Sequence, residues 1–89
     1  MNSPEIKAFI RENKNLFWYT PEDKKEDISL EFLVETILNY GDLKNIKTLI
    51  SILGMEEISR IFFGADGRKR LNYYPEIHNY FSIFFSRYA

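Results

Sequence analysis

The sequence contains no cysteine, a single histidine (His78), and few glycines and prolines. Without cysteine the chain can form neither disulfide bonds nor thiolate metal sites, and one histidine cannot supply a site built from several imidazoles. No uncharged apolar run is long enough to span a bilayer, and the amino terminus lacks a signal-peptide pattern. We therefore expect a cytoplasmic protein that binds no metal, carries no cofactor and contacts no membrane.

Residue groupings typical of an active site are also missing. The serines stand in no motif that places a base and an oxyanion hole beside them. The glycines on either side of Asp66 lack the spacing and the Lys-Ser/Thr pair of a phosphate-binding loop. Glu31 and Glu35 lie off the apolar stripe of their segment, which is typical of a solvated helix face. We therefore expect no enzymatic activity, the alternative being carboxylates that only folding brings together.

The composition indicates one folded domain over residues 1–89. Hydrophobic residues make up 45% of the 89 residues and aromatic residues 17%, which is enough apolar surface to form a modest core. The net charge is −1, so the chain as a whole is not a basic nucleic-acid binder. The charge is uneven, since the first half is acidic and the second half is slightly basic, with its densest basic stretch at residues 68–70.

Apolar residues recur at helical spacing along most of the chain, which predicts an all-α, compact bundle of about five helices. Serine, proline and glutamate at the start of the chain are typical of a helix beginning, and Asp42 can cap a later helix. Gly41 and Gly54 each follow an apolar run where a helix is expected to end. The expected helices cover residues from about 4 to 13, 27 to 40, 42 to 53, 55 to 63, and from 72 or 74 to near the end.

The helices expected at 42–53 and 55–63 form a central hairpin that resembles a helix-turn-helix, with the rest of the chain covering it. The wide apolar arc of the first of these helices includes Ile52 and is typical of a central helix. Residues 16–19 carry four large side chains before Pro21, so we expect an extended arm. We also expect Trp18 in this arm to be buried against the carboxy-terminal helix.

The carboxy-terminal helix has the strongest aromatic pattern. Its apolar stripe should form the main aromatic wall of the core and consists of Ile77, Tyr80, Phe81, Phe84, Phe85 and Tyr88. Ile83 and, approximately, His78 point away from this stripe, so the outer face is also rather apolar. This face can bind a protein partner or a second copy of the chain, the alternative being coverage by the amino-terminal arm. The candidate partner surface consists of Ile52, Ile83 and Phe85.

A second hypothesis is that the hairpin binds DNA as a helix-turn-helix, with residues 55–63 as the reading helix. The side chains that can contact phosphate are Arg60, Arg68, Lys69 and Arg70. Glu56 and Glu57 stand at the start of the reading helix, where they would repel phosphate. A plain helical hairpin within a bundle is the structural alternative.

Several short segments occur in an order that resembles a group of small, mostly uncharacterised bacterial proteins. They are Leu16-Phe17-Trp18, the ILNYGDL run at 37–43, Leu53-Gly54 with Ile58, and Leu71 before the aromatic helix. Some of these proteins are similar to proteins encoded beside nucleotidyltransferase-type toxins, which implies an antitoxin-like or regulatory role. The resemblance covers roughly residues 16–85 and implies no catalytic residue. Tyr19 stands where that group usually has an acidic residue.

Overall fold

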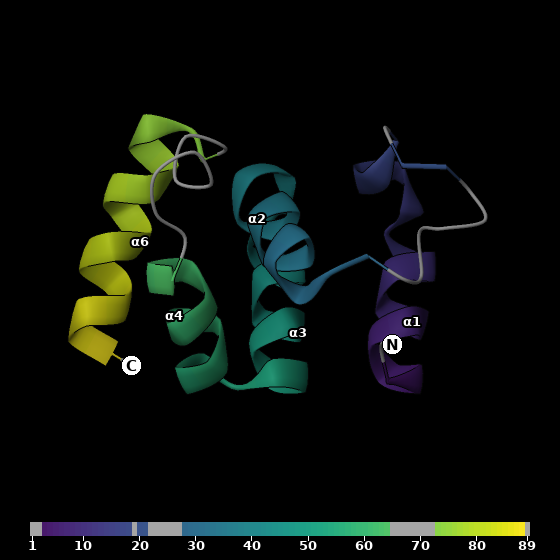
Figure 1. Ribbon diagram of the computed structural model, residues 1–89, viewed down its shortest axis with the longest axis horizontal. Coiled ribbons are helices and arrows are strands. Elements are labelled where there is room, and N and C mark those ends of the chain that lie inside the picture. The colour runs from purple at the N-terminus through teal and green to yellow at the C-terminus, as the bar shows by residue number, and fades with distance from the viewer. Residues whose placement is uncertain (1–2, 19, 22–27, 65–72, 89) are drawn as a thin grey trace.

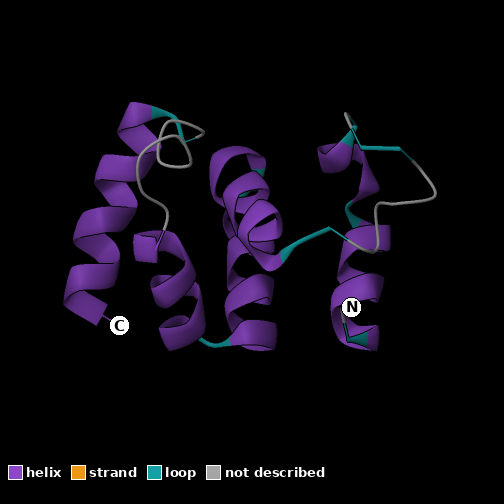
Figure 2. Ribbon diagram, in the orientation of Figure 1, coloured by secondary structure: helices purple, strands orange, loops and turns teal. Residues whose placement is uncertain are grey.

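A computed structural model describes residues 3–18, 20–21, 28–64 and 73–88. These residues form an all-helical globule with no strand among them (Figure 2). The helices are α1 (Pro4–Glu12), the short 3-10 helix η1 (Lys14–Phe17), α2 (Leu30–Tyr40), α3 (Leu43–Leu53), α4 (Met55–Gly64) and α6 (Pro75–Tyr88). The predicted fold of about five helices is confirmed, and the predicted helix ends lie close to the observed ones.

Local capping explains where most of these helices begin. The hydroxyls of Ser3 and Ser29 accept hydrogen bonds from backbone N–H groups in the first turns of α1 and α2, at 3.3 and 3.1 Å. Asp42 and Asn45 form a capping box at the start of α3: each side chain accepts a hydrogen bond from the other's backbone N–H, at 2.9 and 3.0 Å. These bonds satisfy donors that a helix leaves without an internal partner.

The two glycines that end helices do so for different reasons. Gly54 between α3 and α4 has a φ of +90°, a conformation that other residues rarely adopt. Gly41 after α2 has an extended backbone, so its conformation is open to any residue. A Cβ at Gly41 would lie 2.7 Å from the carbonyl oxygen of Ile37, however, so a close approach of the backbone requires glycine there.

The centre of the molecule is α2, not the hairpin of α3 and α4. It packs against η1, α3 and α4, and it is drawn between α1 and the α4–α6 pair in Figure 1. Its fully buried residues are Leu33, Val34, Thr36, Ile37 and Leu38. In α3 only Leu49 is fully buried. The prediction that α3 is the central helix is therefore wrong, because a wide apolar arc does not reveal how much of it the neighbouring helices cover.

The carboxy-terminal part of the core is aromatic and centres on Phe62 of α4. Its ring contacts Phe81 and Phe85 of α6 at centroid distances of 6.4 and 5.3 Å, and Tyr73 at 5.1 Å. His78 stacks on the same ring at 4.9 Å, so the expectation that His78 points away from the core is wrong. These rings join α6 to α4, and α6 reaches the rest of the core largely through them.

The arm around Trp18 also differs from the prediction. Residues 14–17 are helical, and Phe17 is the residue of this segment that enters the core, with none of its surface exposed. Trp18 is 72% exposed. Figure 1 draws this segment beside α1, at the opposite end of the molecule from α6. The prediction that Trp18 is buried against the carboxy-terminal helix is therefore wrong. Tyr19 lies outside the described residues.

Candidate interaction surface

The outer face of α6 gathers large apolar side chains that the fold leaves in solvent. Tyr80, Ile83 and Tyr88 are 60%, 59% and 63% exposed. In the predicted aromatic stripe, Phe81 and Phe85 are buried and Ile77 and Phe84 are half-buried, so the prediction that Tyr80 and Tyr88 are core residues is wrong. The stripe spans a broader arc than α4, the helix against which α6 packs, can cover.

The exposed rings of this face are ordered by contacts along the helix. Tyr80 stacks on Phe84 at a centroid distance of 6.2 Å and an interplanar angle of 11°. Phe84 in turn contacts Tyr88 at 5.2 Å. Together with Ile83 and Arg87, these rings line a shallow groove of about 190 Å³. A row of aromatic side chains beside an arginine is a composition that protein interfaces favour.

A second groove lies on the other side of Ile83 and Arg87, where α6 carries two serines. Ser82 donates a hydrogen bond to the carbonyl of His78 at 2.7 Å, and Ser86 donates one to the carbonyl of Ser82 at 2.6 Å. Both hydroxyls are therefore held against the helix backbone, which leaves a hollow lined by Ser82, Ile83, Ser86 and Arg87. Ile83 and Arg87 thus form a ridge between two grooves.

The other two residues of the predicted partner surface do not lie on this face. Phe85 is only 2% exposed and stacks on Phe81 at 5.5 Å, so its assignment to a partner surface is wrong. Its position in the sequence, two residues after Ile83, places it on the opposite side of the helix, toward α4. Ile52 is half-buried against the core on α3, a helix that is not paired with α6.

Of the predicted phosphate-contacting residues, the structure describes Arg60 alone. Arg60 is exposed on α4 and forms a two-bond ion pair with Glu57, in which its Nε lies 3.2 Å from Oε2. The hydrogen bond from Arg60 lowers the pKa of Glu57, and the same bond raises the pKa of Arg60. Much of the positive charge of Arg60 is therefore offset locally. Arg68, Lys69 and Arg70 lie outside the described residues.

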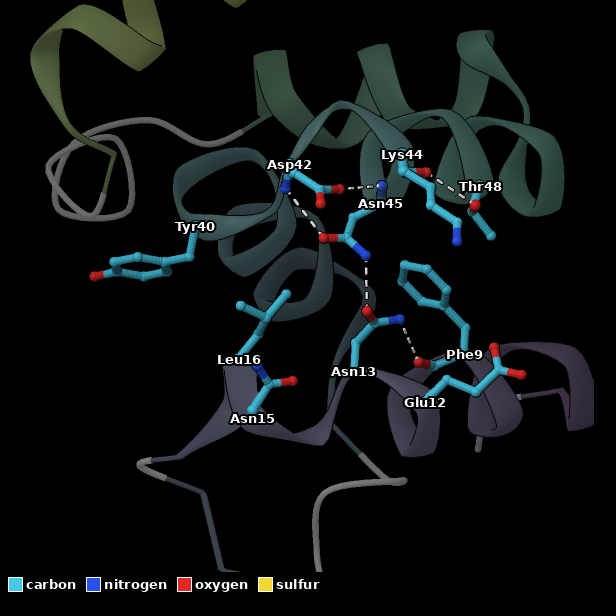
Figure 3. A pocket seen from close by; sticks show the side chains of 10 residues that line it. All are labelled: Phe9, Glu12, Asn13, Asn15, Leu16, Tyr40, Asp42, Lys44, Asn45 and Thr48. Carbon is cyan, nitrogen blue, oxygen red and sulfur yellow. Dashed lines mark hydrogen bonds between the residues drawn. The ribbon is translucent and has the colours of Figure 1, made fainter.

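A polar pocket of about 620 Å³ lies between α1 and the start of α3 (Figure 3). Asn45 donates a hydrogen bond to Oδ1 of Asn13 at 2.7 Å, and Asn13 donates one to the carbonyl of Phe9 at 2.9 Å. Oδ1 of Asn45 also accepts a hydrogen bond from the backbone N–H of Asp42. The side-chain amides of both asparagines are therefore already engaged in hydrogen bonds within the protein. Their amides join α1 to α3, and we interpret them as structural groups rather than as ligand-binding groups.

The link between Asn13 and Asn45 was not predicted from the sequence. The sequence shows Asp42 as a possible helix cap, which is a local signal. Asn13, which accepts the hydrogen bond from the Asn45 amide, lies 32 residues away in the chain. A similar long-range link joins the end of α2 to the segment before α6. There the Tyr74 hydroxyl donates to the Tyr40 hydroxyl at 3.0 Å, and the Tyr74 N–H donates to Asn39 Oδ1 at 3.2 Å.

The described part of the chain contains no group of three or more metal-ligating side chains. Within the same residues, no helix is long and apolar enough to cross a membrane. Comparison of the chain with protein-family models, with curated proteins and with solved structures gives no match. The resemblance to small bacterial proteins therefore stays a prediction from the sequence.

Proposed function

We propose that this chain is a small, non-enzymatic protein-interaction module and that the outer face of α6 is its binding surface. One observation carries the proposal: Tyr80, Ile83 and Tyr88 are each about 60% exposed and line one groove on α6, a helix that packs into the core through Phe81 and Phe85. Isolated exposed apolar residues are ordinary, but a contiguous exposed apolar face is typical of a binding site.

The order of the exposed rings adds support to the proposal. Because Tyr80, Phe84 and Tyr88 contact one another along the helix, their side chains are already restricted before a partner binds. Binding then costs less conformational entropy than it would with freely rotating side chains. Arg87 at the edge of the groove supplies a charge that can orient the partner.

An antitoxin-like regulator is the finer form of this proposal, and its partner would be a toxin protein. The support for this form is the sequence resemblance alone. DNA binding by the α3–α4 hairpin is the alternative, and the contacts of Arg60 weigh against it. Its guanidinium is paired with Glu57, and Glu56 adds a second carboxylate in the first turn of the reading helix. A phosphate would have to share the Arg60 guanidinium with the Glu57 carboxylate, which repels it.

Site-specific photo-crosslinking in the native host tests the proposed surface. A photoreactive phenylalanine replaces Ile83 in one variant and Leu43 in a matched control, since Leu43 is an equally exposed apolar residue on α3. We expect a discrete covalent adduct from position 83 and none from position 43, with the adduct identified by mass spectrometry. Absence of an adduct at position 83, or equal adducts at both positions, would refute the assignment of α6 as the binding surface.

A further inference from the structure

Four exposed residues of α6 form a symmetric pattern. Glu76, Tyr80, Ile83 and Arg87 fall within about 60° of the helix circumference, at 100° per residue, and all four are exposed. The midpoint between Glu76 and Arg87 lies between residues 81 and 82, and the midpoint between Tyr80 and Ile83 lies at the same place. The sequence of this face therefore reads acidic, aromatic, aliphatic, basic around one centre.

Such a pattern is complementary to itself when a second helix runs in the opposite direction. A two-fold axis through the centre of α6 places Glu76 opposite Arg87 of the second copy, and Tyr80 opposite Ile83 of the second copy. Because of the two-fold symmetry, each of these contacts occurs twice in the dimer. A parallel pairing would instead place Glu76 against Glu76 and Arg87 against Arg87, which is unfavourable.

We propose that the partner of the α6 face is a second copy of this chain, bound through an antiparallel, two-fold pairing of α6 helices. This inference rests on the proposed function of the same face and adds the identity of the partner. It places Ile83 at the centre of the interface and the Glu76–Arg87 pairs at its two ends.

The charges at the ends of α6 support this pairing because the described part of the chain does not pair them. Glu76 and Arg87 are 11 residues apart, which is about 16 Å along a helix and too far for contact within one copy. Among the described residues neither has an ion-pair partner. The two-fold pairing gives each of them an opposite charge without any change in the fold.

The shape of this face of α6 also favours packing against a second helix. Ile83 and Arg87 form a ridge, and the flanking grooves are lined by Tyr80, Phe84 and Tyr88 on one side and by Ser82 and Ser86 on the other. Packing a ridge of one helix into a groove of another is the usual way in which two helices associate, and shallow crossings of about 20° are common in bundles.

The length of α6 sets the strength that we expect. A helix of 14 residues is about 21 Å long, so a single helix pair buries less surface than a standard interface of about 800 Å² per partner. We therefore expect association that depends on protein concentration, with a Kd in the range from about 1 μM to about 1 mM, rather than a permanently dimeric chain.

Charge reversal at the two ends of α6 tests the register directly. Sedimentation equilibrium is measured for the full chain and for the variants Glu76→Arg, Arg87→Glu and the double variant, up to millimolar protein at about 10 mM salt, where screening is weak. Each single variant places like charges opposite each other, and we expect its Kd to rise about tenfold. The double variant restores opposite charges, and we expect it to associate like the unchanged chain.

Mixing the two single variants gives the sharpest result. One partner then carries two arginines and the other two glutamates, so the antiparallel register predicts a heterodimer that is tighter than either homodimer. Circular dichroism and thermal unfolding serve as the controls that each variant is folded. A monomeric unchanged chain at every concentration, or a mixture that associates no better than its components, would overturn the inference. An adduct of position 83 with another protein would then leave the proposed function standing, whereas its absence would reject both.

Discussion

At the scale of single residues, Phe62 is the side chain that joins α4 to α6. Its ring lies on α4 and packs against Tyr73, His78, Phe81 and Phe85, which all come from the segment around α6. The next residue, Phe63, is half exposed and makes edge-on contacts with two of these rings, Phe62 and Phe85. Two adjacent residues of the same type therefore occupy very different environments.

Truncation of Phe62 should accordingly be far more destabilising than truncation of Phe63. We expect Phe62→Ala to lower the free energy of unfolding by about 3–5 kcal/mol, or to abolish folding, because it leaves a cavity among packed rings. Phe63→Ala should cost about 1 kcal/mol, since much of that ring is already in water. Urea unfolding of both variants measures the difference, and equal costs would contradict the described core.

Tyr73 is the buried titratable group of this cluster. Burial raises the pKa of the Tyr73 hydroxyl above its ordinary value of 10, and the nearby charge of Glu35 raises it further. A phenol whose pKa is higher in the folded state than in the unfolded state favours folding below the unfolded pKa. That contribution is lost as the pH rises above about 10, where the unfolded chain ionises first.

Replacement of Tyr73 by phenylalanine should therefore flatten the alkaline loss of stability. The free energy of unfolding is measured between about pH 8 and pH 11 for the unchanged chain, for Tyr73→Phe and for Tyr88→Phe. Tyr88 is exposed and serves as the matched control. We expect a smaller fall above pH 10 for Tyr73→Phe only. The same fall in all three proteins would show that the pKa of Tyr73 does not change on unfolding.

The helices themselves could largely be predicted from the sequence because their signals are local. Ser3, Asp42 and Gly54 lie at helix ends and act through hydrogen bonds or backbone conformations within a few residues. The faces of the helices are less predictable. The sequence indicated that α3 and α6 each carry a wide apolar arc, but which part of an arc is covered depends on the neighbours that the fold supplies.

The same distinction explains the successes and failures at the candidate site. Ile83 was assigned to the outer face correctly because helical spacing alone separates it from Phe81 and Phe85. The sequence predicts a buried Trp18 because large aromatic residues are usually buried, yet η1 places Phe17 inward and Trp18 outward. The Asn13–Asn45 bond joins residues far apart in the sequence, so no local signal predicts it.

At the scale of elements, Gly54 determines how α3 meets α4. A Cβ at this position would meet no atom within 4 Å, so only the backbone conformation, φ +90° and ψ 146°, disfavours other residues. We expect Gly54→Ala to cost about 1–3 kcal/mol. Gly64, which also has open space around it but lies within α4, is the matched control.

Gly64→Ala should leave stability unchanged or raise it by about 0.5 kcal/mol, because alanine favours a helical backbone. Chemical unfolding of the two variants separates the conformational effect from any effect of added volume. A Gly54→Ala variant as stable as Gly64→Ala would show that the turn between α3 and α4 does not require a positive φ.

At the scale of the whole molecule, the helices lie roughly in a row with α1 and α6 at the two ends (Figure 1). A helix at the end of such a row has one face in the core and one face in solvent, as α6 does. This arrangement is consistent with the binding surface that we propose on α6.

The proposal that the outer face of α6 is the interaction surface is tested most directly by sedimentation equilibrium. The unchanged chain is compared with the variants Ile83→Asp and Leu43→Asp. Both substitutions replace an exposed apolar residue by aspartate, so neither should affect folding much. We predict that the unchanged chain and Leu43→Asp become heavier than 10.7 kDa with increasing concentration, while Ile83→Asp stays monomeric. If the unchanged chain associates, association of Ile83→Asp to the same extent would contradict pairing through the outer face of α6.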